Sequence, residues 1–327
     1  MNKLLKRFIS IGLVMVLSVS VSACTANKNE PKTPINIAVL KGPTGMGMAK
    51  LMEDESDLVD PNFLFSAYGS PDELVSKIIN NEVDIAALPT NLASVIYNKT
   101  GGDVELIAVN TLGVIYILDT TGTINSIKDL KGKNISASGK GTVVEYVFSY
   151  LLKSNGLDPE KDLEIDYSFS HEELSAHVAA GNIEIALLPQ PFVTTTIMKN
   201  KNVEIAVDLT EEWDALENGS QLTMGCLVAS KAFVEANKDK LDDFLNAYEE
   251  SVTWVNDNPE RAGEYIEKHG IIGNKEVATI AIPNCSIVYK DGKEAKEMLQ
   301  GFYKVLFEID AKALGGTLPN DAFYYQK

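Results

Sequence analysis

The sequence feature that most constrains the fold is an internal repeat with an offset of 100 residues. Segment 74–79 has helical apolar spacing and is followed at 82–89 by Glu-Val-Asp-Ile-Ala-Ala-Leu-Pro. Segment 174–179 has the same spacing and is followed at 182–189 by Asn-Ile-Glu-Ile-Ala-Leu-Leu-Pro. Two copies of one helix and strand unit in a single chain predict two similar α/β lobes.

A second pair of segments has the order strand, glycine loop, helix. The apolar run Ile-Asn-Ile-Ala-Val-Leu at 35–40 leads into Lys-Gly-Pro-Thr-Gly-Met-Gly at 41–47 and then into helical spacing. The order recurs with a strand at 134–138, the loop 138–142 and a helical run at 143–152. Strands that alternate with helices imply right-handed βαβ units, and loops at the carboxyl ends of their strands form ligand crevices. We therefore expect a two-lobe α/β fold, each lobe a mostly parallel sheet flanked by helices, with a ligand cleft between the lobes.

The last third of the chain is predicted to be helical. Segment 231–258 has a helical period that is interrupted around 237–239, a new helix starts at Pro259, and 299–309 is amphipathic. These helices follow both repeats, so we expect them to cover the first lobe after the chain has returned to it. The apolar strands 112–118 and 222–229 are the expected crossings and form a hinge. The predicted division is 35–112 with 224–327 for lobe 1, and 113–223 for lobe 2.

The N-terminus predicts export. Lys3, Lys6 and Arg7 precede an apolar run at 8–21, which ends in Val-Ser-Ala-Cys. A single membrane-spanning helix is the alternative, but the run is shorter than the roughly 20 residues that a bilayer requires. The Val-Ser-Ala-Cys tetrad resembles a bacterial lipobox. The resemblance implies a lipoprotein signal peptide at 1–23, a Cys24 that carries fatty acyl chains such as palmitate, and a polar, proline-broken, lipid-anchored tether at 24–34.

Charge and reactive residues exclude several functions. The chain has 29 Lys and Arg against 46 Asp and Glu, so its net charge of −17 disfavours nucleic acid as a partner. Three His and three Cys show no metal-ligand spacing, and no nucleophile-and-base motif is present, so we predict no metal, no cofactor, no catalytic residue and no enzymatic activity. Cys226 is predicted to be a core residue, and the sequence does not decide whether Cys226 and Cys285 form a disulfide.

Several phrases resemble the solute-binding proteins of ABC importers. They are Glu-Val-Asp-Ile-Ala-Ala-Leu-Pro at 82–89, Ile-Lys-Asp-Leu-Lys-Gly-Lys-Asn-Ile at 127–135, Gly-Lys-Gly-Thr at 139–142, Asn-Gly-Leu-Asp-Pro at 155–159 and Val-Asn-Asp-Asn-Pro-Glu-Arg-Ala at 255–262. The resemblance covers about residues 35–310 and is to the sulfonate-, nitrate- and thiamine-pyrimidine-binding group. It implies a periplasmic-binding-protein type 2 fold that closes on a small solute and docks on a membrane permease. It also implies a lipid anchor at the outer face of the cell membrane, and we expect a monomer because the two lobes must move freely.

Two other functions compete with import. The same broad family contains a pyrimidine-forming enzyme that consumes an active-site His and depends on iron, but that enzyme is expected to carry a Cys-rich motif, which this chain lacks. Ligand-sensing regulators share the fold, but the lipobox and the absence of a helix-turn-helix region argue against that role.

The expected cleft residues lie in loops that follow strands. The only arginines are Arg7 and Arg261, so no bidentate arginine clamp is available there, and helix ends or a lysine must hold any anion. Neutral hydrogen-bonding groups and flat apolar side chains suit a small polar or heteroaromatic solute. The predicted ligand-binding residues are Lys41, Gly42, Thr44, Gly45, Met46, Tyr68, Ser70, Thr90, Asn91, Asn110, Ser138, Lys140, Gly141, Thr142, Gln190 and Phe192.

Each of these residues also has a purely structural interpretation. The lysines can be solvated, the glycines can serve tight turns, Thr90 and Asn91 can cap a helix, and Phe192 can pack. Thr210 is predicted to be the N-cap of a helix. Trp213 in that helix either packs in the core or lies at the mouth of the cleft.

Overall fold

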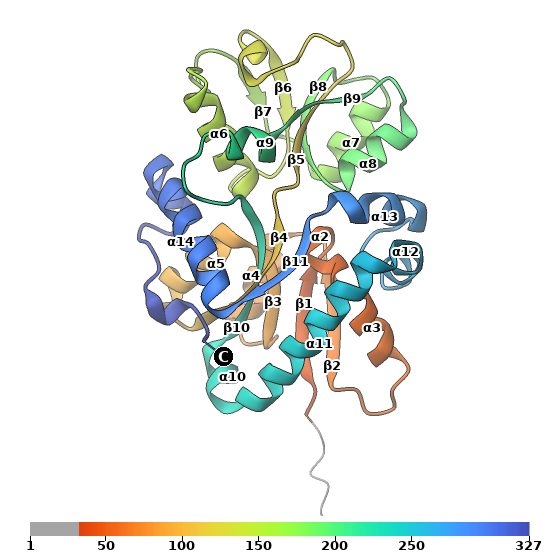
Figure 1. Ribbon diagram of the computed structural model, residues 1–327, viewed down its shortest axis with the longest axis vertical. Coiled ribbons are helices and arrows are strands. Elements are labelled where there is room, and N and C mark those ends of the chain that lie inside the picture. The colour runs from red at the N-terminus through yellow and green to blue at the C-terminus, as the bar shows by residue number, and fades with distance from the viewer. Residues whose placement is uncertain (1–32, 327) are drawn as a thin grey trace, which may run out of the picture. The chain divides into compact units, whose positions relative to one another are not determined.

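Two β-sheets joined by crossing strands form the body of the molecule (Figure 1). The computed structural model describes residues 33–326, so the predicted signal peptide, Cys24 and the tether up to residue 32 lie outside the described residues. We call the first sheet with its helices lobe 1 and the second sheet with its helices lobe 2.

The first sheet has six strands and mixed pairing. β1 pairs in parallel with β2 and β3, whereas β3 with β10, β10 with β4, and β4 with β11 are antiparallel. Its spatial order is β11 (Ile287–Asp291), β4 (Val104–Leu112), β10 (Thr223–Ser230), β3 (Ile85–Pro89), β1 (Ile35–Leu40) and β2 (Phe63–Tyr68).

The second sheet has five strands and is also mixed. β6 pairs in parallel with β7 and β8, and β5 is antiparallel to both β8 and β9. Its spatial order is β7 (Glu164–Asp166), β6 (Asn134–Ala137), β8 (Ile185–Pro189), β5 (Ile115–Asp119) and β9 (Glu204–Asp208). The predicted two-lobe α/β fold is confirmed, but the prediction of mostly parallel sheets is wrong. β10, which follows one crossing, runs against β3, and β5, which follows the other, runs against β8.

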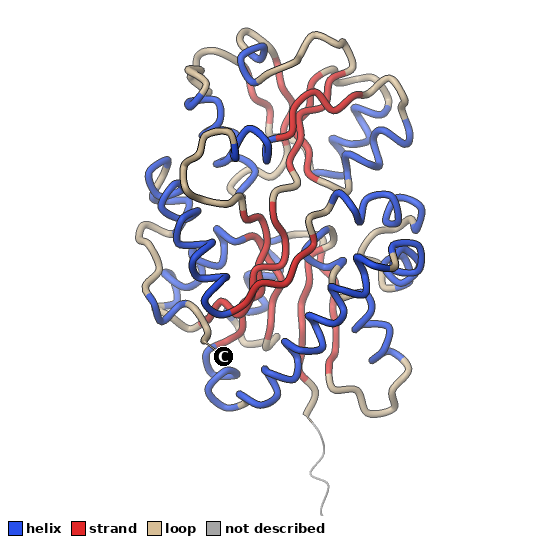
Figure 2. The backbone as a smooth tube through the Cα atoms, viewed as in Figure 1, coloured by secondary structure: helices blue, strands red, loops and turns tan. Residues whose placement is uncertain are grey.

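Helices cover both faces of each sheet (Figure 2). The break predicted around 237–239 is confirmed, since Asn237 separates two helices. The last long helix starts at Gly292, earlier than the predicted 299, because its first two turns are mostly polar and lack the apolar period that marks the rest. Lobe 1 has α2 (Pro43–Met46), α3 (Ala49–Ser56), α4 (Pro71–Ile79), α5 (Thr90–Thr100), α10 (Lys231–Ala236), α11 (Lys238–Asp257), α12 (Pro259–Lys268), α13 (Lys275–Ala281), η2 (Ile282–Asn284), α14 (Gly292–Ile309), η3 (Ala311–Leu314) and η4 (Asp321–Phe323). Lobe 2 has η1 (Ile127–Leu130), α6 (Val143–Ser154), α7 (His171–Ala179), α8 (Phe192–Lys199) and α9 (Leu209–Asp214).

The core of lobe 1 follows the alternation of its strands. In β1, Ile37 and Val39 pack with α2, α3 and α11 on one face, whereas Ala38 and Leu40 pack with α4, α5 and α14 on the other. A strand buried on both faces has apolar residues at successive positions, which explains the continuous run that predicted it. The second of these clusters continues into lobe 2 through β5 and α6.

Trp213 joins the two lobes from inside this core. It is fully buried, with its ring centroid 5.1 Å from that of Tyr150 in α6 and 5.5 Å from that of Phe302 in α14. Its Nε1 donates to the Ser220 carbonyl at 3.2 Å. Trp213 is therefore packing and does not lie at a cleft mouth. Its helix α9 is capped by Asp208, which accepts from the backbone N–H of Thr210, so the prediction of Thr210 as N-cap is wrong.

The crossing from β4 to β5 is tightly packed at Gly113. A Cβ atom at this position would collide with the side chain of Thr210 and would lie 2.7 Å from Cδ2 of Leu222. Ser286 adds a third segment, since its hydroxyl donates to the Gly113 carbonyl at 2.9 Å. Only glycine lets the outgoing chain, the returning chain and the segment before β11 approach one another this closely.

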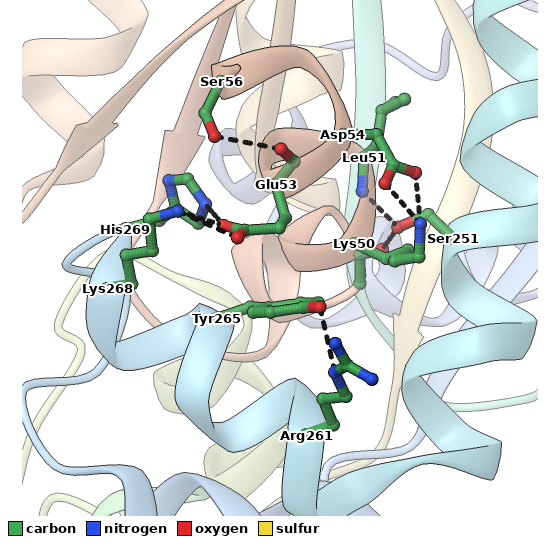
Figure 3. A network of polar contacts seen from close by, with 11 residues as sticks. Lys50, Leu51, Glu53, Asp54, Ser56, Ser251, Arg261, Tyr265, Lys268 and His269 are labelled. Carbon is green, nitrogen blue, oxygen red and sulfur yellow. Dashed lines mark hydrogen bonds and ion pairs between the residues drawn. The ribbon is translucent and has the colours of Figure 1, made fainter.

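Polar contacts from α11 and α12 fix the segment that follows β1 (Figure 3). The Ser251 hydroxyl donates to the Gly47 carbonyl at 2.7 Å and accepts from the Leu51 N–H at 3.2 Å. The Glu53 carboxylate of α3 accepts from Nζ of Lys268 at 2.8 Å and lies 2.9 Å from Nε2 of His269. Lys268 and then His269 hold the pKa of Glu53 below its usual value. These contacts anchor the junction between α2 and α3.

We predict that Gly113→Ala destabilises the protein by about 1–3 kcal/mol, because the methyl group has no space at the crossing. The change should lower the melting temperature by several degrees in calorimetry. Gly273→Ala is the matched control, since no atom lies within 4 Å of a Cβ placed there. Equal melting temperatures for the two variants would contradict close packing at Gly113.

Candidate functional site

The loop after β1 is held against the first sheet by a buried amide. Asn110 of β4 donates through Nδ2 to the Thr44 carbonyl at 3.1 Å, and its Oδ1 accepts from the Thr111 hydroxyl at 3.1 Å. Gly225 of β10 permits this approach, because a Cβ there would collide with Thr44 and lie 2.6 Å from Oδ1 of Asn110. The short helix α2 therefore rests directly on β4 and β10.

The other predicted residues of this loop divide between surface and core. Lys41 is exposed, and its backbone N–H donates to the Tyr68 carbonyl at 2.9 Å. Met46 is completely buried among the core side chains packed under β1, and Gly42 and Gly45 are buried with it. Nearby, Ser70 is exposed at the start of α4 and makes no side-chain cap.

The start of α5 contributes two buried polar residues. The Thr90 hydroxyl donates to the Thr223 carbonyl at 2.9 Å, and the Thr90 carbonyl accepts from the Tyr303 hydroxyl at 2.6 Å. Asn91 donates through Nδ2 to the Gly141 carbonyl of lobe 2 at 3.1 Å. The residue at the N-cap position is Pro89, so neither Thr90 nor Asn91 is a helix cap. Asn91 instead bridges the two lobes.

One face of α5 binds the segment that follows α14. Asn91, Ser94 and Asn98 lie along this face, and each donates to a carbonyl in 313–317. The distances are 3.4 Å from Asn91 to Ala313, 3.0 Å from Ser94 to Leu314, and 2.6 Å from Asn98 to Leu314. The C-terminal segment is thus tied to the helix that carries the bridging asparagine.

The glycine loop of lobe 2 satisfies many of its own polar groups. The Thr142 hydroxyl donates to the Gly139 carbonyl at 2.6 Å and accepts from the Val144 N–H at 3.4 Å, which caps α6. The Gly141 N–H donates to the Glu145 carboxylate at 2.6 Å, while Lys140 is exposed. A carboxylate in the first turn already offsets the positive end of this helix.

Ser138, His171 and Phe192 form a cluster beside that loop. His171 Nδ1 lies 2.6 Å from the Ser138 hydroxyl, and its ring centroid is 5.3 Å from that of Phe192. Burial lowers the pKa of His171 to about 4, so its ring is neutral at pH 7. The predicted ligand-binding residues do not contain His171, although it directly follows the loop 168–170 after β7. Its position at the start of a helix after a strand was the available signal.

Gln190 lies at the end of β8 and faces α8. Its Oε1 accepts from the Thr194 N–H at 3.2 Å and from the Thr194 hydroxyl at 2.8 Å, and its backbone N–H donates to the Val114 carbonyl at 2.9 Å. The side chain thus satisfies a donor in the first turn of α8. Tyr68, at the end of β2, is half-buried and packs against the core side chains of lobe 1.

The structure thus brings together part of the predicted set. Thr44 meets Asn110 within lobe 1, and Asn91 meets Gly141 across the lobes. α13 of lobe 1 also lies against α8 of lobe 2 (Figure 1). We call the place where Asn91 meets Gly141 the lobe boundary. Two surface hollows lie elsewhere, each within a single lobe, with volumes of about 500 Å³ beside 149–160 and about 660 Å³ along α11.

The reactive side chains of the described part of the chain are shielded. Cys226 and Cys285 are free and buried, and burial raises the pKa of both thiols. Within residues 33–326 no group of three or more His, Cys, Asp or Glu is arranged to hold a metal ion. No helix in the same range has the length and apolar character to cross a membrane.

The neutral His171 predicts a pH-dependent loss of stability. Its folded pKa of about 4 lies below the unfolded value of about 6.5, so between these values the unfolded chain binds more protons. Stability therefore falls as the pH drops through this window, by about 2 kcal/mol at pH 5 relative to pH 7.

Urea unfolding at pH 7 and pH 5 measures this effect. His171→Gln should lose that share of the pH dependence, whereas His177→Gln, on the same helix, is the matched control. An unchanged pH dependence in His171→Gln would show that the folded state does not disfavour a charged ring.

Comparisons with known proteins agree with this architecture. A comparison with curated proteins gave no match. An ABC transporter structure from Parabacteroides distasonis shares 26% identity with a TM-score of 0.76, covering 90% of this chain and 99% of that chain. The periplasmic aliphatic sulphonate binding protein SsuA of Escherichia coli shares 16% identity with a TM-score of 0.70, covering 90% and 92%.

A Candida albicans protein described as having the generic periplasmic binding protein fold shares 14% identity with a TM-score of 0.58, covering 88% of this chain and 99% of that chain. These likenesses show a two-lobe periplasmic-binding-protein fold. The model of the family described as NMT1/THI5 like matches residues 69–262, which is more than half of the 327 residues. The chain therefore belongs to the NMT1/THI5-like family.

Proposed function

We propose that this protein is the extracellular, lipid-anchored solute-binding component of an ABC importer, and that it captures a small polar or heteroaromatic solute between its lobes. The observation that carries the proposal is the meeting of two strand-end loops across the lobe boundary, where Asn91 of lobe 1 donates to the Gly141 carbonyl of lobe 2. Ligands of open α/β sheets bind outside the carboxyl ends of the strands, where such loops gather.

The fold neighbours support a binding role. One is described as an ABC transporter protein and another as a sulphonate binding protein of the periplasm. In a two-lobe binder, closure around the solute is the signal that a permease reads, because solute and permease both favour the closed state. The hydrogen bond from Asn91 to Gly141 and the packing of α13 against α8 are the contacts that closure would make and opening would break.

The crossing segments supply the hinge of this proposal. Gly113, Leu222 and Ser286, whose hydroxyl donates to the Gly113 carbonyl, lie together between the two sheets. Rotation there needs few backbone torsions to change, since the strands on either side are paired in their own sheets. Trp213 packs on side chains of α6 and α14, so its surroundings would change with the lobe angle.

We assign the anchor from the sequence. Acylation of Cys24 would hold the body on the outer face of the cell membrane, with 24–34 as the lipid-anchored tether. The proposed partners are the small solute and the membrane subunits of the permease, with the protein itself acting as a monomer.

Thermal unfolding of the full-length protein in mild detergent tests solute capture. The panel holds sulfonates, nitrate, carboxylates, amino acids, pyrimidines and guanidino compounds, each at several concentrations. A specific solute at about 100 times its dissociation constant adds about 2.7 kcal/mol of stability, a shift of a few degrees. Trp213 and Trp254 provide the fluorescence signal.

The recovered solute decides between capture and catalysis. Mass spectrometry of the bound compound should return it unchanged and at one molecule per chain. A solute that is consumed would overturn the importer proposal and favour an enzyme related to pyrimidine-precursor synthases. If no class of solute shifts the transition at any concentration, binding itself is excluded for these classes.

A further inference from the structure

We infer that the solute bound at the lobe boundary offers an N–H or O–H group to Oδ1 of Asn91, and that it is neutral or cationic rather than a strong anion. The inference rests on the proposed function and names the chemical class of its solute. It is carried by one buried acceptor without a partner and by the state of the groups that would otherwise receive an anion.

The orientation of the Asn91 amide is fixed by two carbonyl groups. Its Nδ2 lies 3.1 Å from the Gly141 oxygen and 3.4 Å from the Ala313 oxygen. The opposite orientation would place Oδ1 against both oxygens and lose both hydrogen bonds, so the amide nitrogen must point this way. The amide oxygen is therefore the atom left over.

That oxygen is buried and has no hydrogen-bond partner. Asn91 is 1% exposed, and Oδ1 is one of four buried side-chain atoms without a partner in the described part of the chain. A buried acceptor without a donor is costly, and native proteins rarely leave one unless a ligand or water completes it. Because Nδ2 of the same amide touches lobe 2, this oxygen lies where the lobes meet.

A second unpartnered group belongs to the same region. The Thr223 hydroxyl is fully buried without a partner, while the carbonyl of the same residue accepts from Thr90, the neighbour of Asn91. A hydroxyl both donates and accepts, whereas an amide oxygen only accepts. The pair therefore demands at least one donor from a solute, and no arrangement of acceptors alone satisfies it.

None of the groups expected to hold an anion is buried and free at the lobe boundary. The Gly141 N–H at the start of α6 donates to Glu145, which places a carboxylate where an anion would bind. Lys41 and Lys140 are exposed, and the only arginine in 33–326, Arg261, donates to the hydroxyl of Tyr265 in the network of Figure 3. A sulfonate at this boundary would meet the Asn91 amide oxygen and the Glu145 carboxylate, and of the two unpartnered atoms only the Thr223 hydroxyl could donate to it.

The competing interpretation gives Asn91 a structural role only, as an anchor of the C-terminal segment. Asn98 tests it, because it lies on the same face of α5 and donates to the carbonyls of Leu314 and Thr317 at 2.6 and 2.8 Å without touching lobe 2. Asn98→Leu removes an anchor of the same kind and leaves the lobe boundary intact. It is the matched control for Asn91→Leu.

The experiment compares matched probes on the full-length protein. The donors are urea, acetamide, guanidinium, acetamidinium, 2-aminopyrimidine and 4-aminopyrimidine. Tetramethylurea, dimethylacetamide and the two dimethylaminopyrimidines are the counterparts without donors, and ethanesulfonate and nitrate are the anions. We expect at least one donor probe to raise the melting temperature, and its counterpart without donors to bind at least tenfold more weakly.

The variants locate the effect. Asn91→Leu should weaken that probe at least tenfold, whereas Asn98→Leu should lower the melting temperature without a probe and leave the dissociation constant within twofold. Binding that is unchanged in Asn91→Leu would overturn the inference. The matched probes test the unmodified protein, so the inference stays falsifiable even if Asn91→Leu does not fold.

The anions separate this inference from the proposed function. If ethanesulfonate or nitrate binds and none of the donor probes does, the inference is wrong and capture of a solute stands. If a donor probe and its methylated counterpart bind equally, the inference is also wrong, again with capture intact. If no compound of either class binds, the inference fails, and the wider solute panel of the proposed function decides whether capture fails with it.

Discussion

The close packing of three chain segments around Gly113 is the constraint on which the rest of the structure depends. The chain leaves the first sheet there, and the returning chain at Leu222 and the segment at Ser286 lie against the same residue. One hydrophobic core runs from α14 through Trp213 to α6 and joins the two sheets. In the proposed closing motion the lobes would therefore turn about a packed point, which favours rotation over separation.

The same crossings explain why both sheets are mixed. A strand that returns from lobe 2 enters the first sheet from the boundary side, and β10 consequently runs against β3 and β4. The rest of the chain then has to cover lobe 1, and the segment after α14 is held along α5 by Asn91, Ser94 and Asn98. The helix that reaches lobe 2 is thus stabilised by a segment that is distant from it in sequence.

Local features of the sequence predicted most of the architecture. β1 has the predicted bounds, and the repeat places α4 with β3 and α7 with β8 at the same offset, because apolar periodicity and proline positions are local signals. The βαβ strands pair in parallel as predicted, but the antiparallel pairing of β4, β10, β11, β5 and β9 was missed, because these pairing partners are distant in sequence. For the site, the sequence predicted Asn91 and Gly141 as separate candidates, but not their contact. The orientation of the Asn91 amide depends on the carbonyl of Ala313, 222 residues away, and no local pattern contains that information.

The charge of a binding site follows from which groups are still free, not from which groups are present. The loops of this protein contain lysines and a helix N-terminus, the usual equipment for an anion. In the folded chain Glu145 occupies the Gly141 N–H, the lysines face solvent, and burial keeps His171 neutral. The atoms without partners beside them are an amide oxygen and a hydroxyl. A solute completes a site by supplying what the protein lacks, and at this boundary the missing element is a hydrogen-bond donor.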